Sequence, residues 1–116
     1  MIEELKDIAM EIGKIADNKK GQDIVILDIR RISSFADYFV IISGTSTRHV
    51  KALADEIEDQ MKAKGLDLNH KEGYDTGTWI LMDYNAVIVH VFTEEQRNFY
   101  NIERVWRDAL QLSIDM

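Results

Sequence analysis

Two continuous apolar runs constrain the fold of this chain more than any other feature. Residues 24–27 read Ile-Val-Ile-Leu and residues 38–42 read Tyr-Phe-Val-Ile-Ile, with no strongly polar side chain inside either run. Such runs are typical of strands that are buried within a sheet. The link from Arg30 to Asp37 is too short to hold a crossover helix. We therefore predict that these two strands are antiparallel neighbours.

Helical periodicity on either side of these runs predicts the covering layers. Apolar residues recur at helical spacing over residues 2–16 and again over 50–61, with acidic residues on the opposite side of each pattern. Thr93, with Gln96 three residues later, forms a capping-box pattern that predicts another helix start. After a break near Tyr100-Asn101, a last helix is expected to carry apolar residues from Ile102 to Leu110.

The remaining strands complete one domain. Residues 78–83 and 86–92 predict a hairpin that turns at Tyr84-Asn85, and residues 66–70 predict a short edge strand. The element order is then α-β-β-α-β-β-β-α. We expect a single domain over residues 1–116 of the α/β class, with helices packed on a mixed sheet of about five strands.

Composition narrows the function classes. The chain has 116 residues, 46% of them hydrophobic and 30% charged, which fits one ordinary globular domain. It has no cysteine, which excludes thiol nucleophiles and cysteine-based zinc sites. The net charge of −7 disfavours direct nucleic-acid binding and favours a basic protein partner. No apolar run approaches the roughly 20 residues of a membrane span, and the start lacks a signal-peptide pattern, so we expect a cytoplasmic protein.

No catalytic set emerges from the motifs. The loop Ser43–Ser46 could hold an anion on its backbone amides, but a glycine turn with a capping hydroxyl is the favoured interpretation. Nucleotidyltransferases place two carboxylates one residue apart for two metal ions, whereas Asp83 is followed at that spacing by Asn85. His90 shares a predicted strand face with apolar residues and is interpreted as a core or edge histidine. We therefore predict no catalytic residue, no metal site and no cofactor.

Alternation along residues 78–83 singles out one candidate surface. It places Trp79, Leu81 and Asp83 on one strand face and puts the intervening residues, which look like core, on the other. The carboxylate indicates that the first face reaches water. A Trp and a Leu beside it would form an exposed apolar patch with an acidic rim, which is typical of a protein-binding hot spot. The alternative is that a helix covers this face and buries Trp79.

Four blocks of the sequence, in this order, resemble the ribosomal silencing factor family, also called the Iojap-related family. The resemblance covers nearly the whole chain. The blocks are Phe35-Ala36-Asp37-Tyr38-Phe39-Val40-Ile41 with Ser43-Gly44-Thr45-Ser46, Tyr74-Asp75-Thr76-Gly77-Thr78-Trp79-Ile80-Leu81-Met82-Asp83-Tyr84, Val87-Ile88-Val89-His90-Val91-Phe92, and Arg97-Asn98-Phe99-Tyr100-Asn101-Ile102-Glu103-Arg104-Val105-Trp106.

The resemblance implies a function and a partner. It implies a non-enzymatic translation repressor that binds the large ribosomal subunit on ribosomal protein fourteen and blocks joining of the small subunit. It also implies a nucleotidyltransferase-like fold without transferase activity, and a homodimer when the protein is free. The family's partner-binding strand matches Trp79, Leu81 and Asp83. Weaker candidates for the rim of this surface are Tyr74, Tyr84 and Tyr100.

Two alternatives remain open at this point. One is a nucleotide-handling enzyme of nucleotidyltransferase-like fold that uses the Ser43–Ser46 loop. The other is a dimeric adaptor in which the face carrying Trp79 is the seam between two copies.

Overall fold

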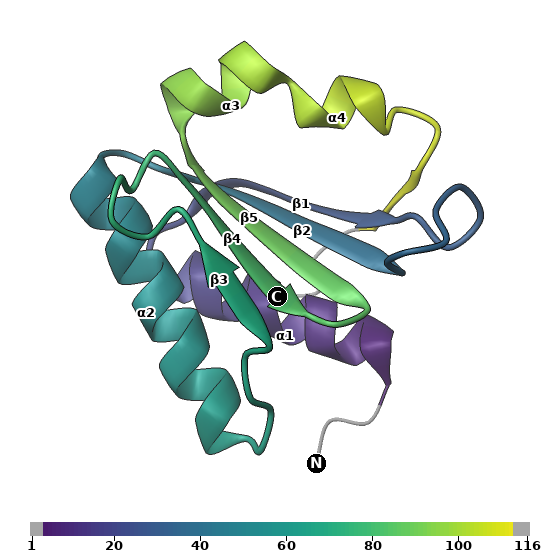
Figure 1. The fold of residues 1–116 in the computed structure, drawn as a ribbon, viewed down its shortest axis with the longest axis horizontal. Coiled ribbons are helices and arrows are strands. Elements are labelled where there is room, and N and C mark those ends of the chain that lie inside the picture. The colour runs from purple at the N-terminus through teal and green to yellow at the C-terminus, as the bar shows by residue number, and fades with distance from the viewer. Residues whose placement is uncertain (1–3, 113–116) are drawn as a thin grey trace.

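A six-stranded sheet separates two helical layers in the computed structural model, which describes residues 4–112 (Figure 1). Helices α1 and α2 cover one face of the sheet, and the short helices α3 and α4 lie over the other. The predicted α/β class is confirmed. In chain order the elements are α1 (Leu5–Asn18), β1 (Gln22–Asp28), β2 (Tyr38–Gly44), α2 (Thr47–Ala63), β3 (His70–Glu72), β4 (Trp79–Tyr84), β5 (Val87–Thr93), α3 (Glu94–Tyr100), α4 (Ile102–Val105) and β6 (Leu110–Leu112).

The sheet is mixed, and its centre is a parallel pair. The strand order is β3-β4-β5-β2-β1-β6. Strands β2 and β5 are parallel, with Val40 opposite Val89, and the other neighbours are antiparallel. The predicted antiparallel pairing of β1 with β2 is confirmed. Every residue of β2 is buried, as its continuous apolar run requires.

Aliphatic packing closes the face beneath α1 and α2. Ile12 of α1 and Leu53 of α2 are fully buried against strand residues such as Val40 and Val89. Helix α2 begins as the sequence predicts, because the Ser46 hydroxyl accepts a hydrogen bond from the backbone N–H of His49 at 3.1 Å. Among residues 4–112, no helix combines the length and apolar character needed to cross a bilayer.

The last predicted helix is wrong beyond Val105. Helix α3 ends at Tyr100 and the chain turns through Asn101 in a left-handed conformation (φ 47°), so the predicted break is confirmed. Helix α4, however, spans only four residues. Leu110 lies in β6, which pairs with the outer edge of β1. Pairing satisfies backbone groups of β1 that a helix would leave open, and it raises the sheet to six strands.

The edge strand at the other side of the sheet is displaced from its predicted range. Strand β3 covers His70–Glu72 rather than residues 66–70. Leu66 and Leu68 instead pack against the core beneath α2 as connecting chain. Two leucines two residues apart can therefore anchor a loop as well as mark a strand.

Gly73 fixes the approach of the chain to β4. It adopts a left-handed conformation (φ 82°), and a Cβ atom at this position would overlap the backbone carbonyl oxygen of Trp79. Gly65 has a similar φ of 89°, but a Cβ atom there would meet open space. The two glycines therefore separate the cost of backbone strain from the cost of steric overlap.

We expect Gly65→Ala to lower the free energy of unfolding by about 1 kcal/mol, the cost of a left-handed alanine. Gly73→Ala should lower it by at least about twice that amount, because the start of β4 must also move. Urea unfolding of the two variants measures the difference. Equal losses of unfolding free energy in the two variants would show that the chain before β4 can shift to accept the added Cβ atom without further cost.

Candidate protein-binding surface

Strand β4 divides its side chains between the two faces of the sheet, as the alternation predicts. Ile80 and Met82 are fully buried beneath α1 and α2. Trp79, Leu81 and Asp83 point to the opposite face and are only half-buried. Trp79 and Leu81 pack there at the margin of a second, smaller hydrophobic cluster. This face, with its partial cover, is the candidate surface.

The Trp79 indole is held on three sides. Its ring stacks on Phe92 with 4.9 Å between ring centroids, and the ring of Tyr100, at the end of α3, lies 4.8 Å away. The indole Nε1–H donates a hydrogen bond of 3.1 Å to Nδ1 of His90. The side chain keeps part of its surface open to solvent. Helix α3 thus covers the indole in part. The sequence left two alternatives open, an exposed face and a face buried by a helix, and the observed cover lies between them.

The aromatic contacts continue across the sheet as one layer. His90 meets Phe39 edge to face at 4.8 Å, and Phe39 meets Trp106 at 5.1 Å. Phe35 completes the row at 6.0 Å from Trp106 and is largely exposed. We call this set the aromatic layer; its members are Phe35, Phe39, Trp79, His90, Phe92, Tyr100 and Trp106.

Sequence reasoning did not assign Phe35, Phe39 or Trp106 to this surface. The signal for Phe39 was present, since it alternates with the buried Val40 along β2. Its position next to Trp106 depends on the path of the chain after α4, which no local pattern of residues specifies.

His90 is a buried, neutral member of the layer, which confirms its interpretation as a core histidine. It is 3% exposed, and burial lowers its pKa from 6.5 to about 4. Because Nδ1 accepts the Trp79 N–H, the imidazole proton is assigned to Nε2. Among the described residues, Nε2 has no hydrogen-bond partner. The histidine thus orients Trp79 without contributing charge.

Asp83 has a structural task as well as a candidate binding role. Its Oδ1 accepts a 2.6 Å hydrogen bond from the backbone N–H of Asn85, which turns the chain into β5 with φ 69°. Its second oxygen has no partner among the described residues and can accept a hydrogen bond from outside. Replacing Asp83 by alanine would therefore disturb the turn together with the charge.

Two of the three predicted rim tyrosines do not lie on this face. Tyr84 is 3% exposed in the core beneath α1 and α2, where burial raises the pKa of its hydroxyl. Tyr74 donates a 2.9 Å hydrogen bond to Asp55 of α2, and the ammonium of Lys71 lies over its ring. Strand alternation and the turn at Gly73 send these side chains to the helical side. Only Tyr100 accompanies Trp79.

The Ser43–Ser46 loop is occupied by hydrogen bonds within the protein. Ser46 caps α2, and the Thr45 N–H donates to Nδ1 of His49 at 2.9 Å. The hydroxyl of Ser43 accepts a hydrogen bond from Arg97. The capping interpretation of this loop is therefore confirmed. Within residues 4–112, no three His, Asp or Glu side chains gather as metal ligands.

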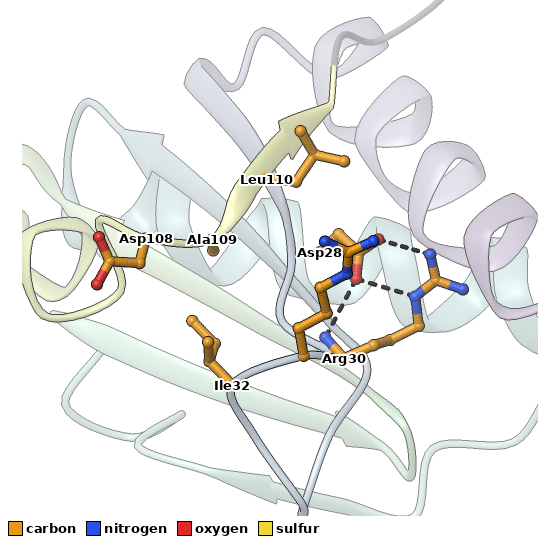
Figure 2. A pocket seen from close by; sticks show the side chains of 7 residues that line it. Asp28, Arg30, Ile32, Asp108, Ala109 and Leu110 are labelled. Atoms are coloured by element: carbon orange, nitrogen blue, oxygen red, sulfur yellow. Dashed lines mark hydrogen bonds and ion pairs between the residues drawn. The ribbon is translucent and has the colours of Figure 1, made fainter.

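A cavity of 590 Å³ opens where the loop after β1 meets the chain entering β6 (Figure 2). On its wall, Arg30 donates two side-chain hydrogen bonds to Asp28, at 2.9 and 2.7 Å. Hydrogen bonding from Arg30 lowers the pKa of Asp28. The other lining residues are Arg31, Ile32, Asp108, Ala109 and Leu110. These walls contain no Ser, Thr, His or Lys side chain to form a nucleophile–base pair.

The fold and this surface define a small α/β protein that presents a preformed aromatic face beside a carboxylate. Comparison with known proteins identifies the family to which the chain belongs. A family model described as "Ribosomal silencing factor during starvation" matches residues 2–116. The chain therefore belongs to the ribosomal silencing factor family, whose members are ribosome-binding factors rather than enzymes. The resemblance stated from the four sequence blocks is confirmed, as is the expectation that the protein is not an enzyme.

Individual relatives match nearly the whole of this chain. Ribosomal silencing factor RsfS of Bacillus subtilis is 40% identical over 110 residues, covering 95% of this chain and 93% of that protein. The chloroplastic protein Iojap of Zea mays is 27% identical over 96% of this chain but only 48% of its own length. A crystal structure of a Chromobacterium violaceum protein, 32% identical, superimposes with a TM-score of 0.88 and covers 98% of this chain and 94% of that one.

The burial of His90 predicts a specific loss of stability in acid. An unfolded histidine takes up a proton near its ordinary pKa of 6.5, whereas the folded one does so only near 4. Stability should therefore fall as the pH drops from about 6.5 to about 4, by up to about 3 kcal/mol, and this contribution should stay constant below that range. Urea unfolding of the wild type and of His90→Gln across this range isolates it. Parallel pH profiles would contradict a buried neutral imidazole.

Proposed function

We propose that the protein represses translation by binding the large ribosomal subunit through ribosomal protein fourteen and excluding the small subunit. The observation that carries this proposal is the partly exposed Trp79, held on a sheet face that α3 covers only in part, in a member of the ribosomal silencing factor family. Tryptophan is enriched among the hot-spot residues of protein interfaces, and one that keeps part of its ring in water can be buried further by a partner.

The support around Trp79 favours tight binding. Phe92 lies beneath the indole, Tyr100 lies beside it, and His90 accepts its N–H. The side chain is therefore already ordered before a partner arrives. A preorganised anchor loses little conformational entropy on binding, so more of its contact energy appears as affinity. Leu81, on the same strand face, extends the apolar contact.

Charge supports a basic partner. The whole chain carries −7, and Asp83 adds a carboxylate to the end of β4, on the face that holds Trp79. One oxygen of Asp83 is bound in the turn, which leaves the other to accept a charge-assisted hydrogen bond from Lys or Arg. Complementary charge also speeds encounter with a positively charged surface.

The proposed repression is steric and requires only that the bound protein occupies space between the two subunits. The folded body measures 33 × 31 × 27 Å. An object of this size, fixed at the face where two subunits meet, prevents their close approach without any chemical step.

Trp79→Ala should weaken binding to ribosomal protein fourteen by at least about thirtyfold, because truncating a hot-spot residue typically costs about 2 kcal/mol. Tyr74→Phe is the control, since its ring lies on the helical side of the sheet. It should bind as the wild type does. Titration calorimetry with the purified ribosomal protein measures both, and unchanged affinity of Trp79→Ala would contradict the proposed surface.

Asp83→Asn separates charge from turn structure. The amide oxygen can still accept the Asn85 N–H, whereas the negative charge is gone. We expect affinity for ribosomal protein fourteen to fall by about fivefold to tenfold at low salt and the difference to shrink at high salt. Binding measured across a salt series checks this. Identical affinity of the two proteins at low salt would remove Asp83 from the interface.

The function itself is tested by co-sedimentation and light scattering. The wild type should pellet with large subunits and not with small subunits, and it should slow the rise in scattering when subunits are mixed. Trp79→Ala should do neither at matched concentration. Binding to large subunits without any effect on joining would overturn the steric mechanism while leaving the surface in place.

The proposal includes a homodimer when the protein is free and action in the cytoplasm. Phe99 and Val105 are 77% and 74% exposed on the α3–α4 side, which supports an apolar contact between copies. Sedimentation of the wild type and of Trp79→Ala distinguishes the possible seams. A monomeric Trp79→Ala variant would indicate that the dimer uses the aromatic face, and apparent affinity for the ribosomal protein would then weaken with concentration.

A further inference from the structure

Arg97 is a buried arginine that joins three elements. It lies on α3 and is 7% exposed. Its Nη1 donates a 2.8 Å hydrogen bond to the Ser43 hydroxyl at the end of β2, and its Nε donates a 2.8 Å hydrogen bond to Oε1 of Glu103 on α4. The proposed mechanism above assigns no role to these contacts.

The segment that Arg97 holds has little other anchorage. Arg97 is the only buried residue of α3, and α4 has none. The two helices meet at Asn101, whose left-handed φ of 47° breaks the helical hydrogen bonding. Partly buried Ile102 and Trp106 add apolar contacts. The α3–α4 segment is therefore joined to the sheet by one charged hydrogen bond, from Arg97 to Ser43, beside partial apolar and aromatic contacts, and Glu103 ties α4 to Arg97. We call these two hydrogen bonds the clamp.

Two aromatic side chains lie close to the clamp along the chain. Tyr100 follows Arg97 by three residues and contacts Trp79, and Trp106 follows Glu103 by three residues and contacts Phe39. If the clamp opens, these bonds no longer fix the positions of the two rings relative to the sheet. The clamp thus lies outside the aromatic layer but next to two of its members.

We infer that Arg97 is a positioning residue for partner binding: through Glu103 and Ser43 it holds the α3–α4 segment so that Tyr100 completes the surface around Trp79. This inference rests on the proposed function. A protein with an open clamp has fewer molecules in the binding-competent arrangement. Its apparent dissociation constant rises in inverse proportion to that fraction.

The test combines amide hydrogen exchange with binding to ribosomal protein fourteen. Glu103→Ala removes the partly exposed end of the clamp and leaves the buried arginine bonded to Ser43. Exchange across residues 94–105 should rise about tenfold or more, exchange in β4 and β5 should stay unchanged, and affinity should fall about tenfold. Glu103→Gln keeps an oxygen for Arg97 and should recover part of both effects.

Glu95→Ala is the matched control. It removes the same side chain from the exposed first turn of α3, where it has no hydrogen-bond or ion-pair partner among the described residues. Its exchange and affinity should match those of the wild type. Arg97→Lys retains a positive charge but cannot make the planar pair of contacts, and it should resemble Glu103→Ala if it folds.

Each other outcome decides against the inference. Unchanged exchange in Glu103→Ala would show that the clamp does not hold the segment. Raised exchange with unchanged affinity would show that the segment plays no part in the surface. Tighter binding would show that α3–α4 obstructs the partner instead. The separate failure of Trp79→Ala to weaken binding would overturn the proposed function and leave the clamp itself intact.

Discussion

The parallel pairing of β2 with β5 is the constraint on which the rest of the structure depends. Both strands lie at the centre of the sheet, and nearly all of their residues are buried. Strands that are apolar on both faces need cover on both faces. Helices α1 and α2 cover one face with buried aliphatic residues. The other face is left to the last quarter of the chain, and the consequences for function arise there.

The two covers differ in kind. Beneath α1 and α2 the contacts are mainly aliphatic, with Tyr38 and Tyr84 among them, and are closed to water. On the opposite face aromatic rings pack over aliphatic residues such as Ile41 and Ile88, and this face is closed only in part, because α3 and α4 are short and contribute one buried residue between them, Arg97. Incomplete cover leaves Trp79 partly in water while rings and a neutral imidazole hold it in place. The shortfall in packing therefore exposes the anchor, and the contacts with Phe92, Tyr100 and His90 keep it ordered.

Local patterns predicted what local physics controls. Alternation in β4 correctly separated Trp79, Leu81 and Asp83 from the core-facing residues. The sequence also predicted a hydroxyl cap at Thr93 and another at Thr45 or Ser46, of which Ser46 is the cap. The helix expected up to Leu110 failed because pairing with the open edge of β1, distant in sequence, overrode a helical period. The burial of Arg97 could not be predicted from the sequence, because arginine in an amphipathic helix normally lies on the solvent-exposed face.

Both tryptophans of the chain, Trp79 and Trp106, belong to the aromatic layer, and the core beneath α1 and α2 contains none. The tryptophan fluorescence of the unlabelled protein, excited selectively over that of tyrosine, therefore originates on one side of the sheet only. Changes in solvent access or ring contacts on that side will alter the wavelength and intensity of this emission. Rearrangements confined to the α1–α2 core will leave it nearly unchanged. The protein thus carries both of its tryptophan fluorophores on the face that we propose as the partner-binding surface.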